Sequence, residues 1–137
     1  MKSLMENDPV LRVPVLLVDD ERNIRLTVSQ TLEDMGLTVH TVSNGEEALK
    51  RLRAETFGLV LLDLKLPGMD GMEVLRRIRT AQPDLPVIIL TAHGSIETAV
   101  TAMKMGAADF IQKPFAPAEL RDVVERAWPA VRSAEGE

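Results

Sequence analysis

The sequence contains no cysteine and no tyrosine, and only three phenylalanines and one tryptophan among its 137 residues. Without cysteine the chain forms neither disulfides nor thiolate metal sites, which is compatible with a reducing cytoplasm. So few aromatic side chains leave little to stack on an isoalloxazine, and no phosphate-cradling glycine loop follows the first apolar run. These absences argue against a flavin-binding module.

Basic residues are also fewer than acidic ones, and long apolar runs are missing. Lys and Arg total 16 against 21 Asp and Glu, a formal net charge of −5 at pH 7, which is the wrong sign for a protein that binds the nucleic-acid backbone. No apolar run approaches the roughly 18 to 20 residues of a membrane span, and residues 1–9 lack the apolar middle of a signal peptide. We therefore expect a cytoplasmic protein that binds neither nucleic acid nor membrane directly.

The length of 137 residues, with 45% hydrophobic and 27% charged residues, is typical of one globular domain. We assign residues 13–131 to this domain. Residues 1–12 are expected to be a flexible N-terminal segment, and residues 132–137 a frayed C-terminal segment or the start of a linker.

Short β-branched runs alternate five times with amphipathic stretches, as in a parallel sheet covered by helices on both faces. The predicted strands are residues 13–18, 37–42, 57–63, 86–90 and 109–112. Right-handed crossovers favour an α/β, doubly wound, flavodoxin-like sheet with strand order 2-1-3-4-5 and five helices on both faces. In that order the ligand crevice lies at the carboxyl ends of the first and third strands.

Turn and cap residues predict where the helices begin and end. Gly36 is expected just beyond the end of the first helix and Pro117 in the first turn of the fifth, which Pro129 is expected to end or kink. The predicted N-caps of the second, third and fourth helices are Asn44, Asp70 and Ser95.

The fourth helix is expected to turn its larger apolar side chains toward the core. These are Ile96, Val100 and Met103. The opposite face would then be an unusually uncharged surface that favours association with a partner or a second copy, formed by Thr98, Ala102 and Met105.

Polar residues follow the predicted strands at one edge of the sheet. Asp19 and Asp20 follow the first strand, Asp63 ends the third, Thr91 follows the fourth and Lys113 follows the fifth. Three converging carboxylates would raise one another's pKa unless a cation compensated them, and the candidates are a divalent metal and the Lys113 ammonium. Oxygen-only ligands favour Mg²⁺.

A carboxylate in this position can act as a nucleophile and form an aspartyl phosphate. The attack requires the incoming phosphoryl oxygens to be neutralised and held in line. A metal and Lys113 would supply positive charge, and Thr91 would supply a hydroxyl donor. We interpret nearby His93 as a loop residue rather than a base.

Four segments, LLVDDE, LLDLKLPGMDG, ILTAHG and DFIQKPF, resemble in order and spacing the signatures of the receiver domain of two-component response regulators. The segment TAHGSIETAVTAMKMGA is most similar to the NtrC-type (sigma-54 activator) receivers. The resemblance implies that Asp63 accepts phosphate from a sensor histidine kinase. It also implies that Mg²⁺ is bound by Asp19, Asp20, Asp63 and the backbone carbonyl of Lys65.

The same resemblance implies that Lys113 pairs with the phosphoryl group, that the Lys113–Pro114 bond is cis, and that Thr91 and Phe110 form a conformational switch. Phosphorylation would switch the surface of the fourth helix, fifth strand and fifth helix, through which a homodimer is expected. The output would be a transcriptional domain that is not in this chain. The domain would be a signalling module rather than an enzyme, although it would assist its own phosphorylation and dephosphorylation.

Two alternatives keep the aspartyl phosphate. One is a stand-alone receiver or the receiver of a hybrid kinase. The other is a phosphohydrolase, as in haloacid-dehalogenase-like enzymes, which carry a second aspartate two residues after the nucleophile. Lys65 occupies that place here, and no cap domain is present to select a substrate.

Overall fold

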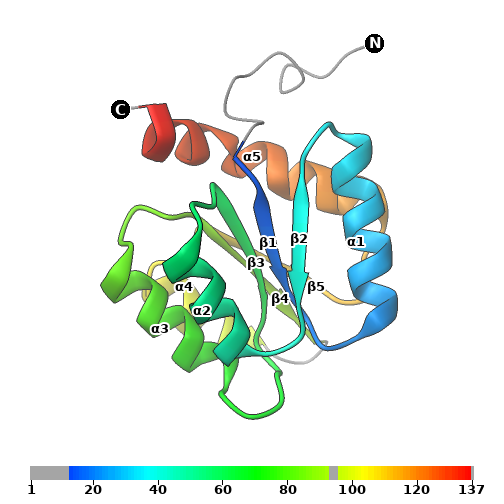
Figure 1. Ribbon diagram of the computed structural model, residues 1–137. Coiled ribbons are helices and arrows are strands. Elements are labelled where there is room, and N and C mark those ends of the chain that lie inside the picture. The colour runs from blue at the N-terminus through cyan, green and yellow to red at the C-terminus, as the bar shows by residue number, and fades with distance from the viewer. Residues whose placement is uncertain (1–12, 93–95, 137) are drawn as a thin grey trace.

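The computed structural model describes residues 13–92 and 96–136, which form one parallel sheet of five strands with helices on both faces (Figure 1). The strand order is β2-β1-β3-β4-β5, which confirms the order predicted from the sequence. The strands are β1 (Val15–Val18), β2 (Val39–Val42), β3 (Leu59–Asp63), β4 (Val87–Thr91) and β5 (Asp109–Gln112). The helices are α1 (Arg22–Asp34), α2 (Gly45–Ala54), α3 (Gly71–Ala81), α4 (Ile96–Lys104) and α5 (Pro117–Gly136).

The central strands are buried on both faces, as their unbroken apolar sequences predict. Every residue of β1, β3 and β4 is buried. Alternate side chains of each strand point to opposite faces, and this divides the core into two layers. In β1, for example, Leu17 belongs to the layer beneath α1 and α5, and Leu16 to the layer beneath α2, α3 and α4.

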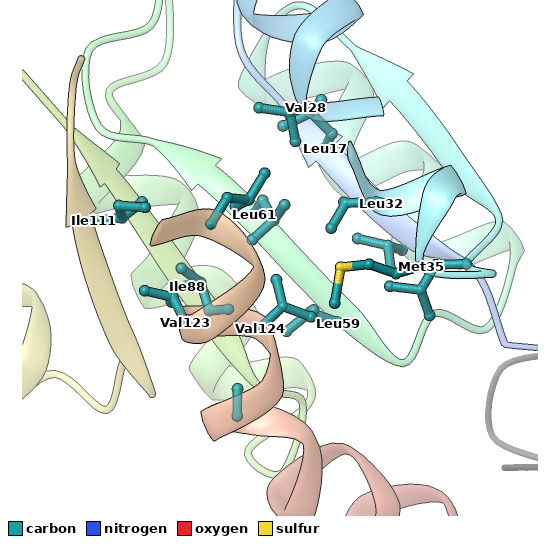
Figure 2. Close-up of a cluster of buried hydrophobic side chains, with 14 of the residues drawn as sticks. Leu17, Val28, Leu32, Met35, Leu59, Leu61, Ile88, Ile111, Val123 and Val124 are labelled. Atoms are coloured by element: carbon teal, nitrogen blue, oxygen red, sulfur yellow. The ribbon is translucent and has the colours of Figure 1, made fainter. Parts of the chain in front are cut away.

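Figure 2 shows the layer beneath α1 and α5, where apolar side chains from both helices close over the sheet. Its labelled strand residues are Leu17, Leu59, Leu61, Ile88 and Ile111, its labelled helix residues are Val28, Leu32, Val123 and Val124, and the labelled Met35 directly follows α1. Helices α2, α3 and α4 cover the other face (Figure 1). The two layers hold the strand ends, and the loops that follow them, in a fixed arrangement.

Several predicted helix ends are confirmed. Gly36 follows α1 with a φ of +91°, a conformation that glycine adopts at low cost. The Asn44 side chain accepts a 2.8 Å hydrogen bond from the N–H of Glu47 and caps α2. Asp70 occupies the N-cap position of α3 but its side chain makes no capping hydrogen bond. His93 and the predicted cap Ser95 lie outside the described residues.

Pro129 was predicted to end or kink the last helix, and the first of these alternatives is wrong, because α5 continues through Pro129 to Gly136. A proline inside a helix removes one hydrogen bond and costs about 3 kcal/mol. Trp128 and Val131, on either side of it, are buried against the sheet, while Pro129 itself is exposed. Burial of these two large side chains favours a helix that runs past the proline.

The prediction for the face of α4 is also wrong. Ile96, Val100 and Met103 are 59%, 48% and 39% exposed, whereas Ala99 and Ala102 are buried. Small alanine side chains on the buried face let α4 lie close to β4 and β5. Of the residues predicted to face outward, Thr98 is exposed, but Ala102 is buried and Met105 is half-buried, so that the exposed apolar surface of α4 is formed by Ile96, Val100 and Met103.

In the described part of the chain, no helix is both long and apolar enough to cross a membrane.

Candidate functional site

The register of the parallel strands brings the predicted site residues to one edge of the sheet. Val18, the last residue of β1, pairs with Leu62, so that Asp19 and Asp63 follow on neighbouring strands. Thr91, the last residue of β4, pairs with Gln112, and Lys113 follows directly. The four side chains come from segments up to 94 positions apart in the sequence and meet because all strands of the sheet point the same way.

Three aspartates form an acidic cluster at this edge. Each of Asp19, Asp20 and Asp63 offers a carboxylate oxygen within 4.8 Å of the others. Asp19 is completely buried, Asp63 is 3% exposed and Asp20 is exposed. One oxygen of each buried aspartate is held by the backbone two residues on: Asp19 Oδ1 accepts the N–H of Glu21 at 2.9 Å, and Asp63 Oδ1 accepts that of Lys65 at 3.0 Å.

The Lys113 ammonium contacts the second carboxylate oxygen of Asp19 and of Asp63, and also the carboxylate of Glu21. Its Nζ atom is 2.7 Å from Asp19 Oδ2, 3.0 Å from Glu21 Oε1 and 3.3 Å from Asp63 Oδ2. Only 13% of the Lys113 side chain is exposed. The Lys113–Pro114 peptide bond is cis, as the resemblance implied. One cation thus faces three carboxylates, and the site keeps an excess of negative charge.

Burial and the crowding of like charges determine the protonation of these groups. Burial, with a further contribution from Asp19, raises the pKa of Asp63 to about 6, although the Lys65 N–H and Lys113 act in the opposite direction. Burial also raises the pKa of Asp19. For Lys113, burial opposes the charged form, but the contacts with Asp19 and Glu21 outweigh it and raise the pKa of this ammonium above its usual range.

The acidic cluster suits a hard divalent cation. Asp19 Oδ2 is buried and accepts no well-directed hydrogen bond within the described ranges, despite the nearby Lys113 ammonium. Together with carboxylate oxygens of Asp20 and Asp63, this oxygen forms the all-oxygen kind of ligand set that Mg²⁺ prefers. Lys65 lies beside the cluster, where it lines a groove of about 400 Å³ together with Leu64, Leu66, Asp70, Thr91, Ala92 and Thr98.

Thr91 and Phe110 occupy neighbouring strands near this groove. Thr91 is 3% exposed, and its Oγ1 donates a 3.3 Å hydrogen bond to the carbonyl of Ala92. Phe110 pairs with Ile89 in the sheet and is half-buried against the layer beneath α2, α3 and α4. Among the residues that the structure describes, the Thr91 hydroxyl thus binds the backbone of the residue that follows it.

Glu21 is a site residue that the sequence reasoning missed. It contacts Lys113 across 92 positions of sequence, and its backbone carbonyl accepts the N–H of Arg25 at the start of α1. Arg25 in turn donates a 2.9 Å hydrogen bond to the carbonyl of Asp19. The position of Glu21 directly after the two aspartates is a signal in the sequence. It does not distinguish a site residue from an ordinary acidic residue at the start of a helix, where acidic residues are common.

A model of the response regulator receiver domain matches residues 15–125 of the chain. The chain belongs to this family. Receiver domains are signalling modules that interact with sensor kinases and bind Mg²⁺ in an acidic pocket, and the aspartate cluster described above could hold such an ion.

Proteins with similar sequences support the resemblance to NtrC-type receivers. The receiver domain is 46% identical over 113 residues to the C4-dicarboxylate transport transcriptional regulatory protein DctD of Rhizobium meliloti (strain 1021), covering 82% of this chain and 25% of that protein. It is 43% identical over 113 residues to the DNA-binding transcriptional regulator NtrC of Escherichia coli (strain K12), covering 82% of this chain and 24% of that protein. The chain therefore spans about a quarter of the length of these curated relatives.

Solved structures confirm the fold. The receiver domain of NtrX from Brucella abortus is 42% identical, with a TM-score of 0.81 over 84% of this chain and 98% of that chain. A CheY-like receiver domain protein from Methanospirillum hungatei JF-1 is 32% identical, with a TM-score of 0.79 over 90% of this chain and 97% of that chain.

Proposed function

We propose that the receiver domain accepts a phosphoryl group on Asp63, in a Mg²⁺-dependent reaction whose donor is the phosphohistidine of a sensor histidine kinase. The observation that supports this most directly is the position of Asp63. Its carboxylate is almost completely buried, yet Oδ2 lies 3.3 Å from the Lys113 ammonium and beside Asp19 and Asp20. A carboxylate in this place is suited to hold a phosphoryl group, because Lys113 and a Mg²⁺ ion held by the aspartates would compensate the charge.

In the proposed step, an ionised Asp63 oxygen forms a bond to phosphorus while the bond from phosphorus to the donor's histidine nitrogen breaks. The electron pair leaves with that nitrogen, which takes up a proton. The pKa of Asp63, raised to about 6 by burial, leaves most of the carboxylate ionised and nucleophilic at pH 7.

The neighbouring side chains would position the phosphoryl group and compensate its charge. Bound Mg²⁺ would neutralise phosphoryl oxygens, and Asp19, Asp20, Asp63 and the backbone carbonyl of Lys65 would hold it. Lys113 would pair with a phosphoryl oxygen, and the Thr91 hydroxyl would donate to another. The same groups would assist the later attack of water that removes the phosphoryl group.

We propose that phosphorylation changes the surface formed by α4, β5 and α5. A phosphoryl group that recruits Thr91 would bias the loop between β4 and α4, and with it the half-buried Phe110. The exposed apolar residues Ile96, Val100 and Met103 on α4 suit a homodimer contact on this surface. By analogy with the regulators to which the domain is similar, the switch would control a transcriptional output domain.

A phosphohydrolase is a less suitable assignment. Two residues after Asp63, where such an enzyme carries its second aspartate, stands Lys65, whose backbone N–H binds Asp63 Oδ1. No acid–base partner is therefore supplied from that position. Turnover of phosphate esters by the purified domain would favour the hydrolase instead.

Intact-mass spectrometry after incubation with acetyl phosphate tests the phosphoacceptor proposal. The wild type is expected to gain the mass of one phosphoryl group with Mg²⁺ and to gain none with EDTA. Asp63→Asn is expected to gain none in either condition. A matched control, Asp84→Asn, changes an exposed aspartate away from the cluster and is expected to behave like the wild type. An unchanged wild-type mass with Mg²⁺, or a phosphorylated Asp63→Asn variant, would refute the proposal.

A further inference from the structure

The Lys113 ammonium already contacts three carboxylates, and it donates hydrogen bonds to those of Glu21 and Asp63. Nζ lies 2.7 Å from Asp19 Oδ2, 3.0 Å from Glu21 Oε1 and 3.3 Å from Asp63 Oδ2, and an ammonium has three N–H groups in all. A phosphoryl group on Asp63 needs at least one of them. Phosphorylation removes the charge of the Asp63 carboxylate and replaces it by the larger charge of the phosphoryl group, which competes with the remaining carboxylates for the ammonium.

The three carboxylates differ in how readily they can leave the ammonium. Asp19 and Asp63 have side chains that are 0% and 4% exposed, whereas the Glu21 side chain is 60% exposed. A buried carboxylate that loses its cation keeps an uncompensated charge away from water, which is costly. An exposed one turns into solvent and is hydrated there. Of the two carboxylates that keep their charge after phosphorylation, Asp19 and Glu21, Glu21 is therefore the one that leaves the ammonium at lower cost.

The backbone of Glu21 is held in place independently of its side chain. Its N–H donates to Asp19 Oδ1 at 2.9 Å, and its carbonyl accepts the N–H of Arg25 at 3.0 Å in the first turn of α1. Glu21 is the N-cap residue of α1, but its side chain makes no capping hydrogen bond. The side chain can thus move without disturbing the aspartate beside it or the helix after it.

We propose that Glu21 is a positioning residue that occupies the phosphoryl contact of Lys113 before phosphorylation and is displaced by the phosphoryl group. This inference rests on the proposed function of Asp63. Asp19 continues to hold Lys113 at the site when Glu21 leaves, so the main effect of Glu21 is competition for the ammonium. Glu21 consequently lowers the affinity of the site for a phosphoryl group.

Binding of beryllium trifluoride, an analogue of the phosphoryl group, measures this competition by ¹⁹F NMR titration at saturating Mg²⁺. Glu21→Gln and Glu21→Asp are both expected to bind the analogue about two- to fivefold more tightly than the wild type, the range for an exposed ion pair. Glutamine removes the competing charge. Aspartate keeps the charge but is one methylene shorter, so that it does not span the distance to Lys113.

Two further measurements make the result specific. Glu33→Gln, an exposed change at the far end of α1, is expected to leave the affinity for beryllium trifluoride unchanged. In the Mg²⁺-free wild type, the ammonium protons of Lys113 are expected to exchange with water more slowly than in either Glu21 variant, as followed by ¹⁵N NMR. This second readout needs no phosphoryl group.

Three outcomes would overturn the inference. If Glu21→Asp binds like the wild type while Glu21→Gln binds more tightly, the charge acts through space and not by contact. If both variants bind like the wild type or more weakly, Glu21 does not compete. If exchange of the Lys113 protons is the same in all variants, the contact is not maintained in solution. Should the wild type itself bind no analogue and accept no phosphoryl group, it is the proposed function that fails.

Discussion

The Nζ atom of Lys113 lies 2.7 Å from Oδ2 of Asp19, and this ion pair joins the loop after β5 to the loop after β1 across the edge of the sheet. Asp19 is completely buried and Lys113 nearly so. The pair compensates part of the acidic cluster before any metal or phosphoryl group arrives. The stability of the folded domain and the chemistry of its site therefore depend on the same charges.

Lys113→Met should destabilise the metal-free domain. Removal of the ammonium leaves Asp19 and Asp63 without their cation, and breaking a buried ion pair costs about 3 kcal/mol. Mg²⁺ should restore part of this loss, because it supplies the missing positive charge. Urea denaturation with EDTA and with Mg²⁺ measures both effects, and Lys104→Met, an exposed change on α4, is the control. An equal loss in both conditions would show that the cation does not bind at these carboxylates.

Asp63→Asn should stabilise the metal-free domain at pH 7 and above. The pKa of Asp63 rises from 3.8 to about 6 on folding, so the folded state binds a proton more readily than the unfolded state. The ionised carboxylate thus destabilises the folded state above pH 6, and this penalty disappears as the pH falls from 6 toward 4. The variant should gain up to about 3 kcal/mol at pH 8.

Denaturation curves in EDTA between pH 4 and pH 8 follow this difference. The gap between Asp63→Asn and the wild type should be widest at high pH and close near pH 4, whereas Asp84→Asn should show no comparable trend. An Asp63→Asn variant that is less stable than the wild type at pH 8, by a difference that disappears as the pH falls, would mean that the pKa of Asp63 is lowered on folding.

Gly71→Ala should disturb the loop that carries Asp63. A Cβ atom at Gly71 would lie 2.5 Å from the carbonyl oxygen of Asp63 and 2.5 Å from Cα of Leu64, both backbone atoms. We expect a loss of about 2 to 3 kcal/mol in the free energy of unfolding, together with weaker Mg²⁺ binding by calorimetry. Gly58→Ala, whose new Cβ would meet a side-chain atom of Val13 at 3.2 Å, should cost less and leave Mg²⁺ binding unchanged.

Two substitutions on α4 test which face packs against the sheet. Ala102→Leu places a larger side chain at a completely buried position and should cost about 1 to 3 kcal/mol of stability. Val100→Ser alters a side chain that is 48% exposed and should change stability by less than about 0.5 kcal/mol. Thermal unfolding of the two variants measures both changes in stability. A larger loss of stability for Val100→Ser than for Ala102→Leu would mean that Val100 packs against the sheet, as predicted from the sequence.

The strand order and the location of the site could be predicted because they follow from periodicity and chain direction. Apolar runs alternate with amphipathic ones, and the handedness of crossovers leaves few arrangements of a parallel sheet. Once all strands point the same way, Asp19, Asp63, Thr91 and Lys113 must share one edge. The cap at Asn44 and the turn at Gly36 depend only on neighbouring residues and were equally readable.

The sequence by itself therefore determined the topology and the edge at which the acidic residues gather, because both depend on the order of residues along the chain. Tertiary structure alone decided the face of α4, the continuation of α5 through Pro129 and the contact of Glu21 with Lys113. Each of these depends on which surfaces and charges meet across the fold. The fit of alanines against the sheet, the burial of Val131 beyond the proline, and the contact of a carboxylate with an ammonium 92 positions away leave no local pattern in the sequence.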